Sequence, residues 1–195
     1  MQAQVLEKVW KSDDIFSLRL KTPSTLQAKP GQFVMVTLSG FPQRAYSIVE
    51  EKDATILLGI KMQQGTSKAL SRLQGGETLD LIGPFGSFIP REGEQVTLVA
   101  GGIGITPMIS LYKHYMLSGV PVQTLISSND DFVFLEYFSA PRLFDTRKGP
   151  RICARDIPQD SLVYLCGPEP MINSLRDDLE KRGHPSNMIF SEDFK

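Results

Sequence analysis

The chain has 195 residues, of which 41% are hydrophobic and 22% are charged, so it has the make-up of a globular protein with one domain or two small ones. Its formal net charge of −1 and its scattered basic residues argue against sequence-independent binding of nucleic acid. No apolar stretch is as long as a membrane span, and Met1 to Lys11 lacks the apolar centre of a signal peptide, so we expect a cytoplasmic protein.

Cysteine and acidic residues limit the chemistry further. Only Cys153 and Cys166 occur, which is too few for a four-cysteine iron–sulfur cluster and gives no sign of a disulfide framework. No pair of acidic residues has a convergent third ligand nearby, so no metal site is expected. Any redox chemistry of this sequence therefore needs an organic cofactor or the metal of a partner protein.

The first ninety residues alternate short extended patterns with turn signals. Strands are predicted at Gln4 to Trp10, Ile15 to Lys21, Gln32 to Leu38, Arg44 to Glu50, Thr55 to Lys61 and Glu77 to Ile82. So many short strands at regular spacing predict an antiparallel barrel or sandwich.

From Gln95 onward, apolar runs alternate with helical segments instead. The predicted order is strand Val96 to Ala100, helix Thr106 to Leu117, strand Val122 to Ser127, short helix near Phe132 to Phe138, strand Leu162 to Cys166, helix Glu169 to Arg182 and strand Asn187 to Phe190. Pro141 to Asp160 is expected to be mostly loop, with room for one short strand. The alternation of strands and helices from Gln95 onward is typical of a parallel sheet with βαβ connections.

Pro90 to Glu94 is polar and rich in turn residues, which makes it the expected domain boundary. We therefore predict an N-terminal antiparallel β-barrel over residues 1–92 and a small doubly wound parallel α/β domain over residues 93–195.

The stretch from Gly101 to Pro107 joins an apolar strand to a helix through a glycine cluster. Thr106 is suited to be the N-cap and Pro107 the first helical residue, while Gly102 and Gly104 would let backbone N–H groups approach a phosphate. Pro107 stands where the Rossmann fingerprint has its third glycine. A phosphate cradle and a plain tight turn between strand and helix both fit this stretch.

Two stretches of the first domain also suit an anionic ligand. Arg44-Ala45-Tyr46-Ser47 combines a guanidinium, an aromatic face and a hydroxyl, and in a strand Arg44 and Tyr46 share one face. Lys61 to Leu70 offers a glycine turn, hydroxyls and a helix start. Taken singly, each is better explained as an ordinary strand arginine or an ordinary capped helix.

Together and in this order, the motifs of the chain resemble those of the ferredoxin–NADP reductase family over nearly its whole length. The motifs are Pro30-Gly31-Gln32-Phe33, Arg44-Ala45-Tyr46-Ser47, Gly65-Thr66-Ser67, Gly83-Pro84-Phe85-Gly86, the Gly101 to Pro107 loop, Cys166-Gly167-Pro168-Glu169-Pro170-Met171 and Glu192-Asp193-Phe194. The resemblance implies a flavin on the barrel and a nicotinamide nucleotide on the second domain, which meet at a cleft.

In the barrel, the resemblance assigns the flavin phosphate to Arg44, the isoalloxazine face to Tyr46 and a hydrogen bond near the reactive nitrogen to Ser47. Gly65, Thr66 and Ser67 would hold the pyrophosphate of FAD, and Ala45 and Lys61 belong to the same cofactor-binding motifs. FAD is the implied flavin, and FMN is an alternative because no clear adenine platform is present.

In the second domain, the resemblance implies three groups of nucleotide-binding residues. They are Gly101, Gly102, Gly104, Thr106 and Pro107 at the pyrophosphate and ribose, Ser127, Ser128 and Asn129 on the adenosine side, and Cys166, Gly167, Pro168 and Met171 beside the nicotinamide. Glu192 and Phe194 would lie near the other face of the flavin, where Phe194 stacks until nicotinamide displaces it. Ser47, Cys166, Glu192 and Phe194 are thus the expected catalytic group.

The acidic pair Asp130-Asp131 follows the second strand of this domain and would repel an additional phosphate, which favours NADH. Ser128 and the nearby Arg147-Lys148 keep NADPH open as the donor. The resemblance implies a flavoprotein oxidoreductase that takes hydride from NAD(P)H and passes electrons to a separate acceptor protein, such as a ferredoxin or an oxygenase component.

Two alternatives stay open at this point. A free flavin reductase would use flavin as a substrate. A non-catalytic nucleotide-binding regulatory subunit is the other, because the second domain is shorter than the family norm around Phe138 to Asp160.

Overall fold

The computed structural model describes residues 1–193. The contacts of the chain divide it into two compact units, Met1–Ile89 and Pro90–Lys195. No helix in the described part of the chain is long and apolar enough to cross a membrane.

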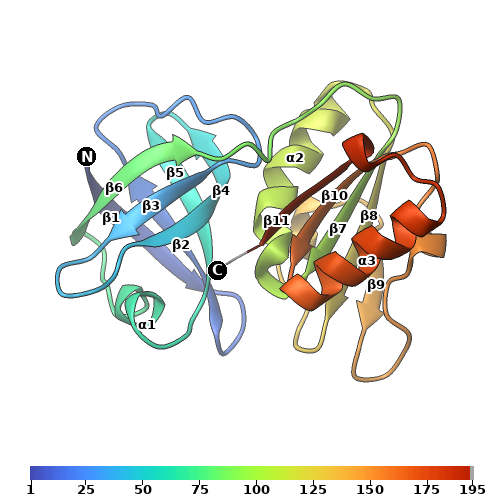
Figure 1. Cartoon of the computed structure of the whole chain (residues 1–195). Coiled ribbons are helices and arrows are strands. Elements are labelled where there is room, and N and C mark those ends of the chain that lie inside the picture. The colour runs from blue at the N-terminus through green and yellow to red at the C-terminus, as the bar shows by residue number, and fades with distance from the viewer. Residues whose placement is uncertain (194–195) are drawn as a thin grey trace. The chain divides into compact units, whose positions relative to one another are not determined.

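The first unit is a closed antiparallel barrel (Figure 1). Its strands follow the order β1-β2-β5-β4-β3-β6 around the barrel. Their bounds are β1 Gln2–Trp10, β2 Ile15–Lys21, β3 Phe33–Thr37, β4 Arg44–Lys52, β5 Thr55–Lys61 and β6 Thr78–Phe85, and the short helix α1 spans Thr66–Leu70. Closure leaves no unpaired sheet edge, which the short strand predictions alone could not establish.

Strand alternation builds the barrel core. In β2, Phe16, Leu18 and Leu20 point inward and are fully buried. In β1, Ala3 and Val5 point inward, but a bulge after Val5 shifts the register and leaves the rest of the strand largely exposed. Each fully buried aliphatic or aromatic side chain contributes about 1.5–3 kcal/mol, so the inward rows of these strands stabilise the barrel.

The second unit is a five-stranded parallel sheet in the order β11-β10-β7-β8-β9. Its strands are β7 Val96–Gly101, β8 Val122–Ser128, β9 Arg142–Asp145, β10 Leu162–Gly167 and β11 Ile189–Asp193. Its helices are α2 Ile105–Leu117 and α3 Glu169–Lys181, with 3-10 turns η1 Gly102–Gly104, η2 Leu135–Tyr137, η3 Ala154–Asp156 and η4 Ser186–Met188.

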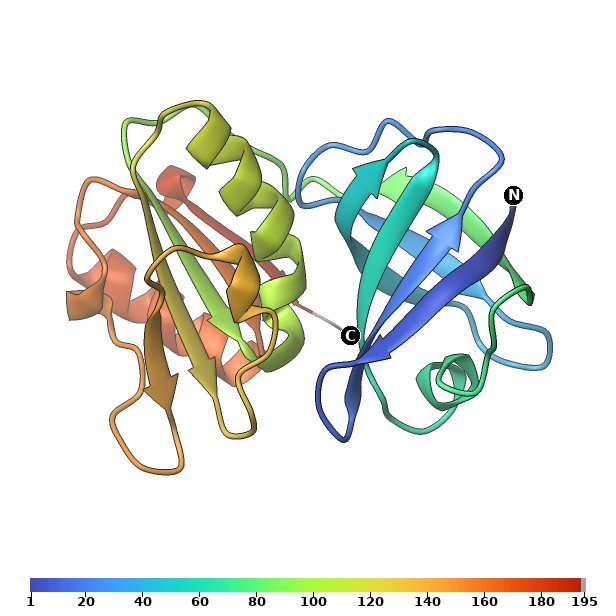
Figure 2. The ribbon, with the colours of Figure 1, turned by 180° about the vertical axis from the view of Figure 1, so that it is seen from behind.

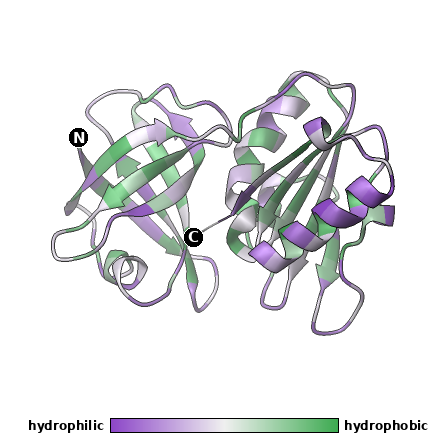
Figure 3. Cartoon of the chain, viewed as in Figure 1, coloured by the Kyte–Doolittle hydropathy of each residue, from purple (hydrophilic) through white to green (hydrophobic). Residues whose placement is uncertain are grey.

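The two long helices lie on opposite faces of this sheet, as the views from the front and from behind show (Figures 1 and 2). Every residue of β7 and β10 is buried, because helices cover both faces. The strands are accordingly mostly green and α3 is mostly purple in Figure 3. This is the doubly wound arrangement that the βαβ pattern predicts, and with the barrel it confirms the predicted fold class.

Several boundaries differ from the sequence predictions, among them the start of α2 and both ends of β11. The 3-10 turn η1 starts the helical winding early, so α2 begins at Ile105 and Thr106 is not its N-cap. The Thr106 hydroxyl instead donates to the Ile103 carbonyl at 3.0 Å. The last strand begins two residues later than predicted and extends to Asp193, which places Glu192 inside the sheet. The single short strand expected between Pro141 and Asp160 is β9.

Candidate functional site

The Arg44-Ala45-Tyr46-Ser47 motif opens strand β4, as predicted. Arg44 pairs with Val36 of β3 and Tyr46 with Val34, so both side chains lie on the same side of the ladder. Tyr46 packs against the barrel core, and burial raises the pKa of its phenol to about 12, an effect that the nearby Arg44 charge partly offsets. The Tyr46 hydroxyl therefore stays neutral beside the exposed Arg44 side chain.

Ser47 has a hydroxyl without a protein partner. Its side chain is 2% exposed, and its Oγ is buried with no hydrogen-bond partner among the described residues. A buried unpaired hydroxyl destabilises a fold by about 1–3 kcal/mol, so such atoms mark places where a ligand or water completes the bonding. Ser47 is thus suited to hydrogen-bond a polar atom of a bound ring.

The turn before α1 lies beside the start of β4. The Thr66 hydroxyl donates to the Pro42 carbonyl at 2.6 Å, which brings Gly65 and Thr66 close to the segment that leads into Arg44. Gly65 has φ +77° and open space where a Cβ would stand. Ser67 is buried and its hydroxyl accepts from the Gln63 N–H at 2.8 Å, so at this turn backbone groups rather than hydroxyls are available to an anion.

Pro42, whose carbonyl accepts the Thr66 hydrogen bond, was not among the predicted site residues. The sequence indicates it only through its position two residues before Arg44. Lys61 was singled out, and its ammonium is 3.3 Å from the Asp14 carboxylate of the β1–β2 turn. Asp14 therefore holds Lys61 at the rim of the barrel.

Two glycine-rich loops of the second unit pack directly on each other at the carboxyl ends of β7 and β10. A Cβ on Gly104 would lie 2.2 Å from the Cys166 carbonyl oxygen, and a Cβ on Gly101 would lie 2.8 Å from the sulfur of Met171. A Cβ on Gly167 would meet the Gly101 Cα at 2.9 Å. These glycines let the two loops touch backbone to backbone.

Gly102 differs from its neighbours. Its φ is +54° and a Cβ there would meet nothing within 4 Å. A nucleotide phosphate can approach the backbone at this position, since the other glycines of the loop are covered by the protein. Within the predicted phosphate-binding stretch Gly101 to Pro107, Gly102 faces open space. Thr106 and Pro107 are instead buried at the start of α2.

Cys166 and Glu192 are neighbours in the sheet. They form a register pair between the parallel strands β10 and β11, followed by Gly167 and Asp193. Cys166 is fully buried, and burial raises the pKa of its thiol well above the usual value, with the Glu192 and Asp193 carboxylates adding to the effect. Cys166 therefore stays a neutral thiol and is not a thiolate nucleophile.

Glu192 carries a carboxyl group that titrates near neutrality. Its Oε2 is buried without a hydrogen-bond partner among the described residues, and burial, aided by the Asp193 charge, raises its pKa from 4.5 to about 7. At neutral pH this carboxyl can both hold a proton and release it, which is the property of a general acid or base.

Replacing Glu192 by Gln should stabilise the protein at alkaline pH. The folded-state pKa is raised, so the favourable contribution of the neutral carboxyl is complete below pH 4.5 and is lost as the pH rises through about 7. Relative to wild type, the free energy of unfolding of Glu192→Gln should therefore rise by about 2 kcal/mol between pH 4.5 and pH 8, allowing for partial exposure. Urea unfolding at several pH values measures this difference.

Glu180→Gln is the matched control, because Glu180 is exposed on α3. Its difference from wild type should stay flat over the same range. A flat difference for Glu192→Gln as well would contradict the raised pKa.

The remaining predicted residues flank these loops. Ser127 and Ser128 end β8 and are each 8% exposed, and Asn129 follows them at the surface. Pro168 and Met171 close the start of α3 over Gly101. The predicted catalytic residue Phe194 lies outside the described residues. Among residues 1–193, no group of acidic, histidine and cysteine side chains is placed to hold a metal ion.

A family model and several known proteins are similar to this chain. Residues 2–89 match the family model of the oxidoreductase FAD-binding domain. The electron transfer subunit of dihydroorotate dehydrogenase B (NAD(+)) from Caldanaerobacter subterraneus subsp. tengcongensis is 29% identical over 91% of this chain and 76% of its own. The reductase component of propane 2-monooxygenase from Mycolicibacterium goodii is 27% identical over 100% of this chain and 67% of its own.

Solved structures share the fold at lower identity. Phthalate dioxygenase reductase matches 99% of this chain and 67% of its own with a TM-score of 0.85 at 20% identity. The flavohem-like FAD/NAD binding domain of nitric oxide dioxygenase from Vibrio cholerae matches 99% of this chain and 98% of its own with a TM-score of 0.83 at 22% identity. These likenesses establish a ferredoxin reductase-like fold.

Proposed function

We propose that the chain is a ferredoxin reductase-like flavoprotein oxidoreductase that takes hydride from NAD(P)H and passes electrons to a separate acceptor protein. One observation carries the proposal. A barrel of the FAD-binding family and a doubly wound sheet with two converging glycine loops stand in one chain.

In the barrel, the available groups fit a flavin. Arg44 supplies an exposed cation for a phosphate, Tyr46 supplies a flat face held by the core, and Ser47 supplies the unpaired hydroxyl. The open backbone at Gly65 accepts a further phosphate. Bound flavin would supply the hydride acceptor and release electrons singly, which no amino-acid side chain does.

In the second unit, we assign the nucleotide pyrophosphate to the open backbone at Gly102 and the nicotinamide to the loop after Cys166. Hydride transfer needs alignment of two rings rather than strong acid–base catalysis. Cys166 contributes a neutral, packed surface, and Glu192 can hold a proton at its carboxyl near pH 7. The shortened segment before β10 still supplies an edge strand, β9, which supports a complete nucleotide site.

For the acceptor, we propose a ferredoxin or an oxygenase component, or the catalytic subunit of a dehydrogenase. The relatives are named as an electron transfer subunit and a reductase component, which supports this role. The two cysteines of the sequence cannot ligate a four-cysteine cluster, so these residues do not hold the acceptor themselves. Both are free thiols, one of them exposed, which supports a reducing, cytoplasmic location.

The test is a visible absorption spectrum of the purified protein with added FAD or FMN, followed by NADH and, separately, NADPH without oxygen. We expect a bound-flavin band that NAD(P)H bleaches, and reoxidation upon addition of a one-electron acceptor protein. A bound flavin that neither donor bleaches would contradict hydride transfer. No bound flavin, with turnover only in excess free flavin, would favour a free flavin reductase instead.

A further inference from the structure

Within residues 1–89, three aromatic side chains are strongly exposed, although an apolar ring gains by burial. They are Trp10, Phe41 and Phe85, at 45%, 40% and 43% exposure. Phe41 lies in the loop between β3 and β4, three residues before Arg44. Three residues of chain span at most about 10 Å, so Phe41 is close to the cation proposed for the flavin phosphate.

The strand directions place the other two rings elsewhere. β4 begins at Arg44 and is antiparallel to β3, which is antiparallel to β6, so Phe85 at the end of β6 lies at the opposite end of the barrel from Arg44. Trp10 ends β1, which is three strands away from β4 in either direction around the closed barrel. Phe41 is therefore the exposed ring that the fold brings nearest to the start of β4.

The β3–β4 loop also reaches the turn before α1. The Thr66 hydroxyl donates to the carbonyl of Pro42, the residue after Phe41, at 2.6 Å. Figures 1 and 2 show this loop and α1 at the same end of the barrel. Phe41 thus lies near the open backbone of Gly65, to which the proposed function assigns a further phosphate.

The loop fixes the Phe41 backbone. The Phe41 N–H donates to the Leu38 carbonyl at 3.0 Å, and Gly40 between them takes the φ of +82° that this turn requires. Pro42 restricts the residue before it to an extended conformation. A ring on a fixed loop loses little conformational freedom when a flat ligand stacks on it, so less of the contact energy is lost to ordering.

The order of these groups matches the order of the parts of FAD. Tyr46 offers a flat face for the flavin ring, Arg44 lies about 7 Å away along β4 with a cation for phosphate, and Phe41 follows beyond it. FMN ends at its first phosphate, whereas FAD continues through a second phosphate and a ribose to an adenine. An adenine beyond the phosphates needs a flat apolar partner, and aromatic side chains bind bases by stacking.

We propose that the exposed ring of Phe41 stacks on the adenine of FAD and thereby makes the barrel select FAD over FMN. This inference rests on the proposed function, because it concerns the flavin of the same site. Phe41 lies beyond the phosphate groups, so it contacts only the part of FAD that FMN lacks. A single phenylalanine in a loop forms no pattern in the sequence, which is why no adenine platform was predicted.

The test is a calorimetric titration of flavin-free wild type and Phe41 variants with FAD and with FMN. We expect wild type to bind FAD at least about fivefold more tightly than FMN, and Phe41→Ala to bind FAD at least about fivefold more weakly with unchanged affinity for FMN. Phe41→Tyr keeps the ring and should keep the preference. Phe41→Leu keeps apolar bulk without a ring and should lose it.

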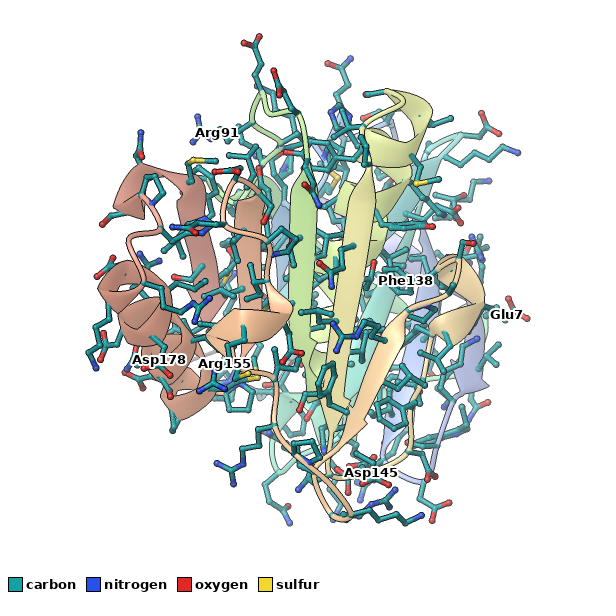
Figure 4. The ribbon with its side chains drawn as sticks, turned by 90° about the vertical axis from the view of Figure 1, so that its right-hand side faces the viewer. Glu7, Arg91, Phe138, Asp145, Arg155 and Asp178 are labelled. Atoms are coloured by element: carbon teal, nitrogen blue, oxygen red, sulfur yellow. The ribbon has the colours of Figure 1, made fainter. Side chains whose placement is uncertain are left out.

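Trp10→Ala is the matched control, because Trp10 is as exposed as Phe41 but lies on β1, opposite β4 in the strand order. Glu7→Gln is a second control on the same strand, and Figure 4 shows Glu7 at the outer surface of the barrel. Neither change should alter the ratio of FAD to FMN affinity. Urea unfolding of Phe41→Ala should match wild type, since the removed ring is exposed.

Three results would overturn the role of Phe41: equal affinity of wild type for FAD and FMN, equal weakening of both flavins in Phe41→Ala, or a retained preference in Phe41→Leu. Failure of the proposed function has a different signature. If FAD binds but neither NADH nor NADPH bleaches it, hydride transfer fails while the titration still decides the role of Phe41. If wild type binds neither flavin, both proposals fail.

Discussion

Replacing Gly104 by Ala should destabilise the second unit by at least about 3 kcal/mol and abolish reduction by NAD(P)H. The new Cβ would lie 2.2 Å from the Cys166 carbonyl oxygen, 2.5 Å from its carbonyl carbon and 2.9 Å from the Gly167 nitrogen. All three atoms are backbone, so no side chain can turn away to make room. The loops after β7 and β10 would have to separate.

Gly102→Ala is the matched control within the same loop. Its φ of +54° strains an alanine, but a Cβ there meets nothing within 4 Å. We expect a loss of about 1 kcal/mol for this change. Urea unfolding of the three proteins tests the difference in stability, and NADH reduction is compared between Gly104→Ala and wild type only, because Gly102 is itself assigned to the pyrophosphate. Equal stability of Gly104→Ala and wild type would show that the loops do not pack as described.

Replacing Arg44 by Ala should weaken binding of FAD or FMN at least tenfold and leave the fold intact. Arg44 is exposed at the start of β4, and its guanidinium contacts the neighbouring Gln43 carbonyl at 3.4 Å. A charge-assisted bond to a phosphate contributes about 1.5–3 kcal/mol, which matches a tenfold to hundredfold change in dissociation constant. Fluorescence titration with each flavin measures it.

Riboflavin separates the phosphate contact from the ring contacts, because it lacks the phosphate. Arg44→Ala should bind riboflavin as wild type does, and Arg44→Lys should recover part of the FAD affinity. Arg72→Ala is the control for loss of a positive charge, since Arg72 is an exposed barrel residue after α1. Unchanged FAD affinity in Arg44→Ala would remove Arg44 from the phosphate site.

Residue patterns along the sequence were sufficient to predict the fold class. The inward row of β2 and the buried face of α3, with Ile172, Leu175 and Leu179, follow periods of two and of three to four residues. Such periodicity depends only on local geometry, so it shows directly in the order of residues. The clustered motif Arg44 to Ser47 lies within one strand for the same reason.

Boundaries near glycine were less predictable. The 3-10 turn over Gly102–Gly104 moves the start of α2 ahead of Thr106, because the backbone already winds before the residue that has the best capping side chain. Likewise, the turn over Ser186–Met188 delays the start of β11 to Ile189. The strand then extends to Asp193. The later end of β11 places Glu192 opposite Cys166.

The sequence by itself determined which residue types are present for a flavin and a nucleotide, and in which order. Only the tertiary structure distinguished Gly102, which has open space, from Gly104, which is packed against the Cys166 carbonyl. It likewise decided that Arg147 is paired with Asp145 and that the Ser47 hydroxyl has no partner among the described residues. Steric room, ion pairing and burial depend on atoms brought together from distant parts of the chain, and these contacts leave no local pattern in the order of residues.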